Sequence, residues 1–331
     1  MHASGFRAGG VKLGTALVTL LCLVNIAAFP VWAAAGTIKE FTVPTPSSGP
    51  SNIRVGPDGN LWFTEYRANK VARMTPTGGF KEFTVPTPNS GPVDIEPGSD
   101  GALWFTEGNA NKIGRVTTGG SFRQFTVPTP SSSPDGMIGG PDGALWFAEF
   151  NANKIGRINT SGVFKEFKIP TPNSGTDDVG LGPDGALWFT ESRGNKIGRI
   201  STAGKIKEFS IPTPSSQPYD VITGADGALW FTELGANKIG RITTTGSYKA
   251  YTVASCCGTS GLLLAARGAD GNVWFTEQFA GKIGRITRSG GITQFSLPTP
   301  SAAPVGITAG PDSDIWFAES SGNKIGRITT K

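Results

Sequence analysis

One phrase repeats through the whole of this chain. Trp-Phe pairs recur at intervals of 42, 42, 42, 42, 44 and 42 residues, with their tryptophans at Trp62, Trp104, Trp146, Trp188, Trp230, Trp274 and Trp316. Around each pair the same motif returns, as in residues 183–200, PDGALWFTESRGNKIGRI. A single unit of this length cannot bury its own hydrophobic face, so such repeats stack on one another. The periodicity therefore restricts the chain to a repeat architecture.

Each unit divides into four short strands. In the fourth copy we expect strands over 178–181, 186–191, 196–201 and 206–211, and the Asp184-Gly185 pair is typical of a hairpin turn between the first two. No window keeps the 3.6-residue period of a helix. Seven four-stranded units predict an all-β, seven-bladed β-propeller with antiparallel strands in each blade.

The two ends of the chain support a closed ring. The last copy stops after its third strand, near residues 324–331, and the missing strand is present at the other end as TIKEFTV, residues 37–43. Pairing the two ends would complete the last blade and remove an exposed sheet edge. We therefore predict one propeller domain over 36–331, with its last blade closed by the N-terminal strand.

Residues 1–35 have the pattern of a secretory signal peptide. Arg7 and Lys12 precede an apolar stretch over 13–29, and small residues follow at 33–35. An uncleaved membrane anchor is the other interpretation, but the apolar stretch is short for a bilayer-spanning helix. We expect cleavage near 33–35 and a secreted protein, extracellular or periplasmic, with no membrane attachment afterwards.

Charge and histidine content exclude several functions. The chain has 30 basic and 25 acidic residues, and removing Arg7 and Lys12 leaves 28 against 25. This small excess gives no reason to expect a nucleic-acid partner. The one histidine is His2, so the mature chain would have none. Histidine-dependent triads and histidine metal ligands are then excluded. We expect a monomer without an organic cofactor.

The two cysteines that would remain, Cys256 and Cys257, are adjacent. They lie in ASCCGTSG, residues 254–261, where the sixth copy lacks Pro-Thr-Pro and is two residues longer. A vicinal disulfide would stiffen this connection. Free thiols, pairing between chains, or metal binding together with a partner are the alternatives.

The predicted topology places a site at one mouth of the central channel. The Pro-rich connections and the turns after each second strand share this face. The first strand should begin here, at the position 14 residues before each WF-x-E glutamate. Around the ring this position is polar and acidic on one arc and apolar on another, holding Ser51, Val93, Asp135, Asp177, Tyr219, Leu263 and Val305. We predict ligand binding by this set, Val93 excepted.

Seven glutamates end the second strands, at Glu65, Glu107, Glu149, Glu191, Glu233, Glu277 and Glu319. Because every blade has one, a structural role in pairing or capping is favoured over a ring of metal ligands. Asp135 and Asp177, in consecutive blades, would form an oxygen-rich site with Glu149 and Glu191, and such sites suit Mg²⁺ or Ca²⁺. Solvated or turn-capping aspartates are the alternative.

The repeated DG-x-LWFTE…NKIGRI phrase resembles the virginiamycin B lyase (streptogramin lyase) family of propellers, over nearly all of 36–331. It is more loosely similar to NHL-repeat and gluconolactonase-like propellers. The resemblance implies a lyase that linearises cyclic streptogramin B antibiotics by elimination. In that family a histidine removes a proton next to a carbonyl, and Mg²⁺, held partly by a glutamate, stabilises the negative charge that develops.

The family's base lies in a Pro-His-Gly-like phrase, which corresponds here to Pro304-Val305-Gly306. By this resemblance Glu319 corresponds to the metal-binding glutamate, whereas Val305 replaces the base. Leu263 stands where the family has another histidine. Neither Val nor Leu accepts a proton, so the histidine-dependent mechanism should be absent. Asp177 and Glu319 are the candidate substitute bases.

Three functions are compatible with these observations. The first is a binding module for a small molecule or cyclic peptide at the channel mouth, without the family's chemistry. The second is a lyase with a carboxylate base, or a metal-dependent, lactonase-like enzyme that opens a cyclic ester. The third is an extracellular scaffold whose disc faces bind protein or glycan.

Overall fold

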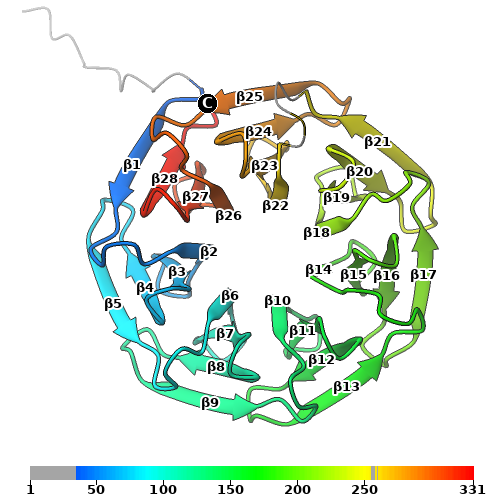
Figure 1. Cartoon of the computed structure of the whole chain (residues 1–331), viewed down its shortest axis with the longest axis horizontal. Helices are drawn as coiled ribbons and strands as arrows, with labels where there is room; N and C mark the ends of the chain where they lie inside the picture. Colours follow the sequence, from blue (N-terminus) through cyan, green and yellow to red (C-terminus); the bar gives the residue numbers. More distant parts are fainter. Residues whose placement is uncertain (1–34, 255–257, 259) are drawn as a thin grey trace, which may run out of the picture. The chain divides into compact units, whose positions relative to one another are not determined.

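The computed structural model describes residues 35–254, 258 and 260–331. The predicted targeting segment, apart from its last residue, and the Cys256–Cys257 pair lie outside these residues. The described part is a ring of seven four-stranded antiparallel sheets around a central channel (Figure 1). None of its residues forms a helix long and apolar enough to cross a membrane. The predicted seven-bladed, all-β propeller is confirmed.

Four strands build each blade from the channel outward. The inner strands are β2 (Pro50–Val55), β6 (Pro92–Pro97), β10 (Pro134–Gly139), β14 (Val179–Leu181), β18 (Pro218–Thr223), β22 (Leu262–Arg267) and β26 (Pro304–Ala309). The second strands are β3 (Leu61–Glu65), β7 (Leu103–Glu107), β11 (Leu145–Glu149), β15 (Leu187–Glu191), β19 (Leu229–Glu233), β23 (Val273–Glu277) and β27 (Ile315–Glu319).

The third strands are β4 (Lys70–Met74), β8 (Lys112–Val116), β12 (Lys154–Ile158), β16 (Lys196–Ile200), β20 (Lys238–Ile242), β24 (Lys282–Ile286) and β28 (Lys324–Ile328). The outer strands are β1 (Ile38–Thr42), β5 (Phe80–Thr84), β9 (Phe122–Thr126), β13 (Phe164–Lys168), β17 (Ile206–Ser210), β21 (Tyr248–Thr252) and β25 (Ile292–Ser296). We number the blades from 1, which is β2–β5, to 7, which is β26–β28 completed by β1.

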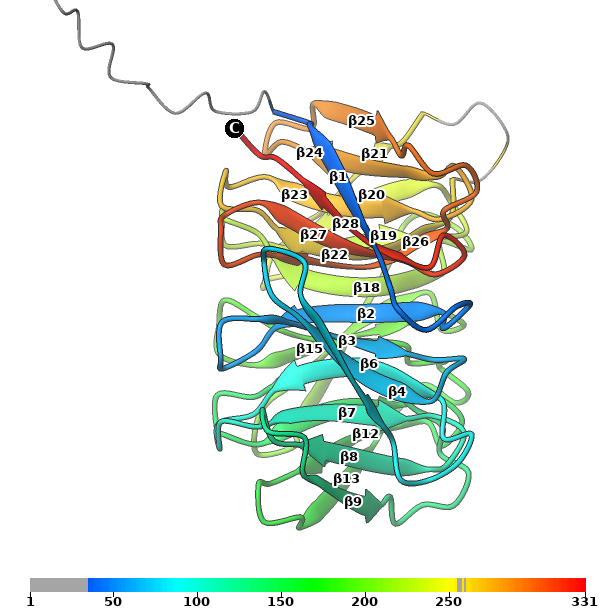
Figure 2. The same ribbon diagram turned by 90° about the vertical axis from the view of Figure 1, so that its left-hand side faces the viewer.

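The N-terminal strand closes the ring as predicted. β1 pairs antiparallel with β28, with Ile38 opposite Ile328 and Thr42 opposite Lys324. Figures 1 and 2 both show the two strands side by side. Blade 7 therefore contains both ends of the propeller and leaves no unpaired strand at the closure.

The core lies between the blades. Trp62 of blade 1 packs with Ile95, Leu103 and Phe105 of blade 2, and its ring stacks on Phe83 with centroids 5.5 Å apart. Equivalent tryptophans lie in the other clusters. Truncating one such buried aromatic typically costs about 3–5 kcal/mol. This contact explains why the Trp-Phe pair recurs in every copy.

In six of the seven blades an asparagine in the turn after the second strand fixes the crossover to the next blade, and in blade 6 Gly281 takes its place. Asn111 has a left-handed φ of 56°, which asparagine tolerates better than most residues. Its side-chain amide donates to the carbonyls of Val127 and Thr129 at 3.1 and 3.0 Å. Its oxygen accepts from the amide and hydroxyl of Ser132 at 2.7 and 2.8 Å. The start of the inner strand that follows each of these asparagines, where the predicted site lies, is thereby held in place.

Candidate functional site: the channel mouth

The structure brings the seven predicted ring positions together at one end of the channel. Two adjoining hollows lie there. The lower, of about 40 Å³, is lined by Ser51, Val93, Asp135, Asp177, Tyr219 and Val305 and by Asn52, Asp94, Gly136, Asp178 and Leu264. The upper, of about 360 Å³, is lined by Gly49, Ser51, Tyr66, Arg67, Tyr219, Leu263, Gln278, Val305 and Ser320. The mouth is thus a two-level site.

A β-bulge at the start of the inner strands makes both levels possible. In blade 3, Pro134 pairs with Glu149 and the next pair is Met137 with Phe147, so two residues oppose one. A bulge of this kind breaks the alternation of side chains between the two faces. Asp135 and the residue after it therefore both line the channel.

Blade 4 departs from this pattern. Its inner strand begins only at Val179, and Thr176 stands where five other blades have a proline that starts the strand. The amide of Gly136 donates instead to the carbonyl of Asp177 at 3.0 Å and joins blades 3 and 4 directly. A Cβ on Gly136 would lie 2.2 Å from the Asp178 carboxylate, so only glycine fits this close approach. The two predicted acids, Asp135 and Asp177, consequently flank one inter-blade contact.

Burial changes the acidity of the mouth. The pKa of Asp135 is raised well above its usual range by burial and by the neighbouring Asp177 carboxylate. Burial also raises the pKa of Asp177 to about 6, although a hydrogen bond from Ser192 opposes the shift. The pKa of the Tyr219 phenol next to them is also raised, by burial and then by the charge of Asp135. Both carboxyl groups therefore release their protons at higher pH than ordinary aspartates do.

A second acidic layer, which the sequence analysis missed, lies directly behind this ring. Asp94, Asp178 and Asp220 are 2%, 8% and 4% exposed, and each accepts from a backbone amide of the following inner strand. Asp94, for example, accepts from the amide of Met137 at 2.6 Å. Burial and then the Asp220 charge raise the pKa of Asp178. These carboxyl groups link adjacent blades by hydrogen bonds, and we call Asp94, Asp178 and Asp220 the staple layer.

Arg54 is the cation of this layer. It donates to Glu96 at 3.0 Å and to the side-chain oxygen of Asn52 at 2.8 Å. Burial opposes its charge, but Asp94 and Glu96 outweigh burial and raise its pKa. In turn burial, only partly offset by Arg54, raises the pKa of Glu96 to about 7 and of Asp94 to about 6. The guanidinium of Arg54 is thus paired with the acidic groups behind the ring.

The second-strand glutamates lie elsewhere, in the body of each blade. Glu149, Glu191 and Glu319 are fully buried, and neither oxygen of any of them has a hydrogen-bond partner among the described residues. The charged neighbours of Glu149 are Glu166 and Lys154, whereas those of Asp135 are aspartates of the channel. The structure therefore does not bring Glu149 and Glu191 to the two aspartates in the way the sequence suggested.

The surroundings of Glu319 fit an ammonium group better than a magnesium ion. Lys324 donates to Glu40 at 2.6 Å, and the two face the Glu319 carboxyl. The same glutamate–glutamate–lysine set recurs at Glu65, Glu149 and Glu191. Within the described residues, no group of three or more acidic, histidine or cysteine side chains is arranged to hold a metal ion. The predicted Mg²⁺ or Ca²⁺ site at Asp135 and Asp177 stays a prediction.

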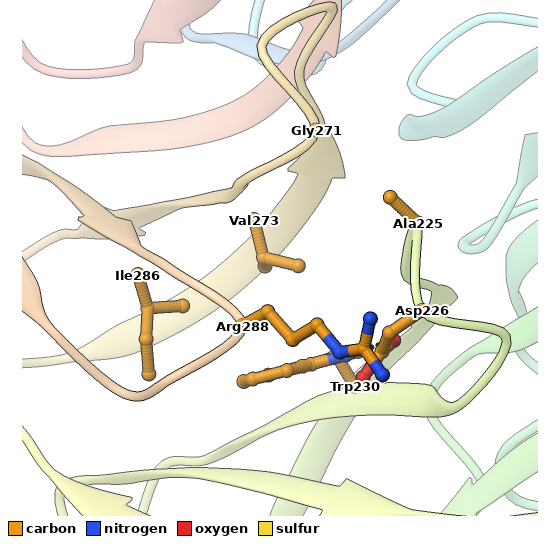
Figure 3. A pocket seen from close by; sticks show the side chains of 7 residues that line it. All are labelled: Ala225, Asp226, Trp230, Gly271, Val273, Ile286 and Arg288. Carbon is orange, nitrogen blue, oxygen red and sulfur yellow. Dashed lines mark hydrogen bonds between the residues drawn. The ribbon is translucent and has the colours of Figure 1, made fainter.

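A further hollow of about 140 Å³ lies at the other end of the blades, between the hairpin turns of blades 5 and 6 (Figure 3). Figure 3 shows the Arg288 guanidinium beside Trp230 and Asp226. Asp226 already accepts from the Trp230 indole at 3.0 Å and from Arg241 at 2.7 Å. The Asp–Trp bond recurs in all seven blades. This hollow is therefore built mainly from scaffold residues.

Comparison with known proteins decides the family. The model of the virginiamycin B lyase family matches residues 28–179 and 171–331. The chain belongs to the virginiamycin B lyase family. Virginiamycin B lyase from Staphylococcus aureus superposes with a TM-score of 0.84 at 40% identity, over 88% of this chain and 99% of that one. A streptogramin B lyase structure gives 0.85 at 40% identity, over 90% and 98%.

Other members add two facts. A virginiamycin B lyase from Saccharopolyspora erythraea is 49% identical over 41 residues, which is 12% of this chain and only 14% of that protein. Another structure of the Staphylococcus aureus virginiamycin B lyase, also 40% identical, is of a catalytically inactive variant with a histidine replaced by alanine, with quinupristin. In that lyase, replacing one histidine is thus associated with inactivity. The WD40 propeller of Doa1, at 13% identity, shares the fold alone.

Proposed function

We propose that this virginiamycin B lyase-like propeller is an exported binding module that holds a ligand at the channel mouth without the family's histidine-dependent elimination. The observation that supports this proposal is which residues form the ring at the channel mouth. Val305 and Leu263 line the upper hollow at the positions where the resemblance places histidines. The sequence offers no substitute histidine, since His2 lies in the predicted targeting segment.

Binding needs less of the site than catalysis does. The upper hollow of about 360 Å³ is within the range of small-molecule pockets, and it combines apolar walls with a few polar groups. Leu263 and Val305 supply apolar surface, whereas Ser51, Tyr219 and Gln278 supply hydrogen-bonding groups. Such a mixture can orient a ligand without a group that removes a proton.

Asp177 favours a second candidate, a lyase with a carboxylate base. It lines the lower hollow, and its pKa of about 6 makes it a stronger base than an ordinary aspartate. Glu319 has less support as a base, because its side chain is fully buried among Glu40 and Lys324. A metal-assisted version would use Asp135 together with Asp177.

Mass spectrometry of a streptogramin B depsipeptide incubated with the purified protein and Mg²⁺, with and without EDTA, separates the two candidates. We expect intact substrate in both samples, together with heat released on binding in calorimetry. A linearised product of unchanged mass would contradict the binding module. If that product also disappeared in Asp177→Asn, the carboxylate base would replace our first proposal.

A further inference from the structure

The two levels of the mouth carry opposite charge. The lower hollow is lined by the carboxylates of Asp135 and Asp177, and the upper one contains the guanidinium of Arg67. Ser51 and Tyr219 line both hollows, so a single molecule can extend from one to the other. A ligand that matches this arrangement has a cationic end toward the channel and an anionic end toward the rim.

The acidic end has no cationic partner among the described residues. Among the described residues, neither Asp135 nor Asp177 forms an ion pair within 4 Å, and the buried Oδ2 atom of Asp177 accepts no hydrogen bond. The charge of Arg193 lowers the pKa of Asp177, but its guanidinium lies over the Phe150 ring, 4.5 Å from the centroid. An unpaired buried carboxylate is costly, so this end favours a bound cation or a proton.

A neighbouring residue independently shows unmet hydrogen-bonding capacity. Thr176 immediately precedes Asp177 and is 0% exposed, yet its hydroxyl has no partner among the described residues. The equivalent residue starts the inner strand in the other blades and is a proline in five of them: Pro50, Pro92, Pro134, Pro218 and Pro304. The chain thus replaces an apolar residue by an unsatisfied polar one at the acidic arc alone. Thr176 itself lines neither hollow, so it marks the irregularity of blade 4 next to the acidic arc and not a contact with the ligand.

An ammonium group fits this end better than a metal ion does. Asp94 and Asp178 also line the lower hollow, but their carboxylates already accept from the amides of Met137 and Val221. The two remaining carboxylates fall short of the six to eight oxygen ligands that Ca²⁺ takes, and the opposite arc of the ring is apolar, at Leu263 and Val305. A primary ammonium has three donors, which two carboxylates and a neighbouring phenol such as Tyr219 can satisfy. The apolar arc then contacts the carbon skeleton that bears it.

The rim end suits a carboxylate. Arg67 is exposed and forms no ion pair within the described residues. A guanidinium presents its donors in a planar fork that binds a carboxylate with two parallel hydrogen bonds. A cyclic depsipeptide has no free carboxylate or amine in its closed backbone, whereas a linear peptide has one at each end.

We propose that the mouth binds a short linear peptide with free ends, its ammonium group between Asp135 and Asp177 and its carboxylate on Arg67. The inference rests on the proposed function, because it names the ligand class of the same site. It assigns the acidic arc to the peptide's amino terminus and the apolar arc to its first side chains.

The test measures calorimetric binding of the tripeptide glycyl-leucyl-glycine, its N-acetyl form and its C-terminal amide. We expect each blocked form to bind about 10- to 100-fold more weakly than the free peptide, as for loss of one charged hydrogen-bonded contact. Asp177→Asn should weaken the free peptide by a similar factor and leave the affinity of the N-acetyl form unchanged. Arg67→Gln should do the same for the amide. Arg267→Gln, an exposed arginine at the far end of an inner strand, is the matched control.

Three results would overturn the inference. One is equal affinity for free and blocked peptides, and another is equal weakening of all three peptides by Asp177→Asn. The third is saturable binding of Mg²⁺ or Ca²⁺ that requires Asp135 and Asp177 and excludes the tripeptide. If the tripeptide fails but an intact streptogramin B depsipeptide binds and Tyr219→Ala abolishes this, the ligand class is wrong and the proposed function stands. If neither binds, both fail.

Discussion

Replacing Glu149 by glutamine should stabilise the propeller at neutral and alkaline pH. Glu149 ends β11 with both carboxylate oxygens buried and without partners among the described residues. Its neighbour Glu166 takes the available donors: the Thr129 amide at 2.9 Å, the Thr129 hydroxyl at 2.7 Å and Lys154 at 2.6 Å. Burial, and then the charge of Glu166, raise the pKa of Glu149 to about 8.

The magnitude follows from this pKa. In the unfolded chain Glu149 titrates near 4.5, so below that pH both states hold the proton and no free energy is lost. Between 4.5 and about 8 the unfolded chain releases the proton and the folded chain retains it, so stability falls as pH rises. At about 1.36 kcal/mol per pH unit, the loss at pH 7 is roughly 3 kcal/mol, an upper estimate. A neutral glutamine does not titrate and should recover most of it.

Blade 2 supplies the matched control. Glu107 occupies the same place, but its neighbour is Gln124, whose amide donates to both carboxylate oxygens at 2.8 Å. Glu107→Gln would set one amide against another and lose a charge-assisted bond, so it should destabilise by about 1–2 kcal/mol. The same substitution should therefore stabilise the protein in blade 3 and destabilise it in blade 2.

Urea denaturation at pH 5, 7 and 8, followed by tryptophan fluorescence and far-ultraviolet circular dichroism, measures both variants. We expect the midpoint of Glu149→Gln to exceed that of the parent protein increasingly from pH 5 to 8. A midpoint gap independent of pH, or destabilisation by Glu149→Gln at pH 8, would refute the assignment of a retained proton to Glu149.

Two further substitutions and one deletion test the scaffold. Arg54→Leu leaves buried carboxylates without their cation and should cost about 3–5 kcal/mol, seen as a lower thermal midpoint; an unchanged midpoint would contradict the staple layer. Asp142→Ala removes the acceptor of the Trp146 indole and the Arg157 guanidinium, and should cost about 1–3 kcal/mol in urea denaturation. Deleting residues 36–43 removes β1 and exposes the edge of β28; size-exclusion chromatography should show association or loss of the compact species, and an unaltered monomer would argue against closure by β1.

The propeller could be predicted because each copy has the same sequence pattern and the two ends of the chain together supply the four strands of the last blade. The strands expected at 178–181, 186–191, 196–201 and 206–211 differ from β14 to β17 by one residue at most at any end. Closure by β1 followed from a fourth strand missing at one terminus and present at the other. Repetition turns a weak local signal into a strong one, because seven independent copies agree.

The second acidic layer could not be predicted in the same way. Simple alternation places only one of two successive residues on the channel side, and the sequence does not show the bulge that admits both. Asp94, Asp178 and Asp220 were therefore overlooked, although they adjoin the predicted ring. The face of β11 on which the Glu149 side chain lies could not be predicted either. β11 is buried along its whole length, so periodicity does not tell which side faces the channel.

The distinction between repeated and unrepeated residues connects these findings. A group present in all seven blades, such as the aspartate that accepts from each tryptophan, stabilises every blade equally and cannot single out one ligand orientation. Orientation requires asymmetry, and among the described residues the mouth has it, because Asp135 and Asp177 lie on one arc and Leu263 and Val305 on another. Val305 and Leu263, at which the resemblance places histidines, form the apolar side of this asymmetry. A site can thus lose a proton acceptor and still discriminate the two ends of a ligand, because recognition depends on the arrangement of charge and apolar surface around the ring.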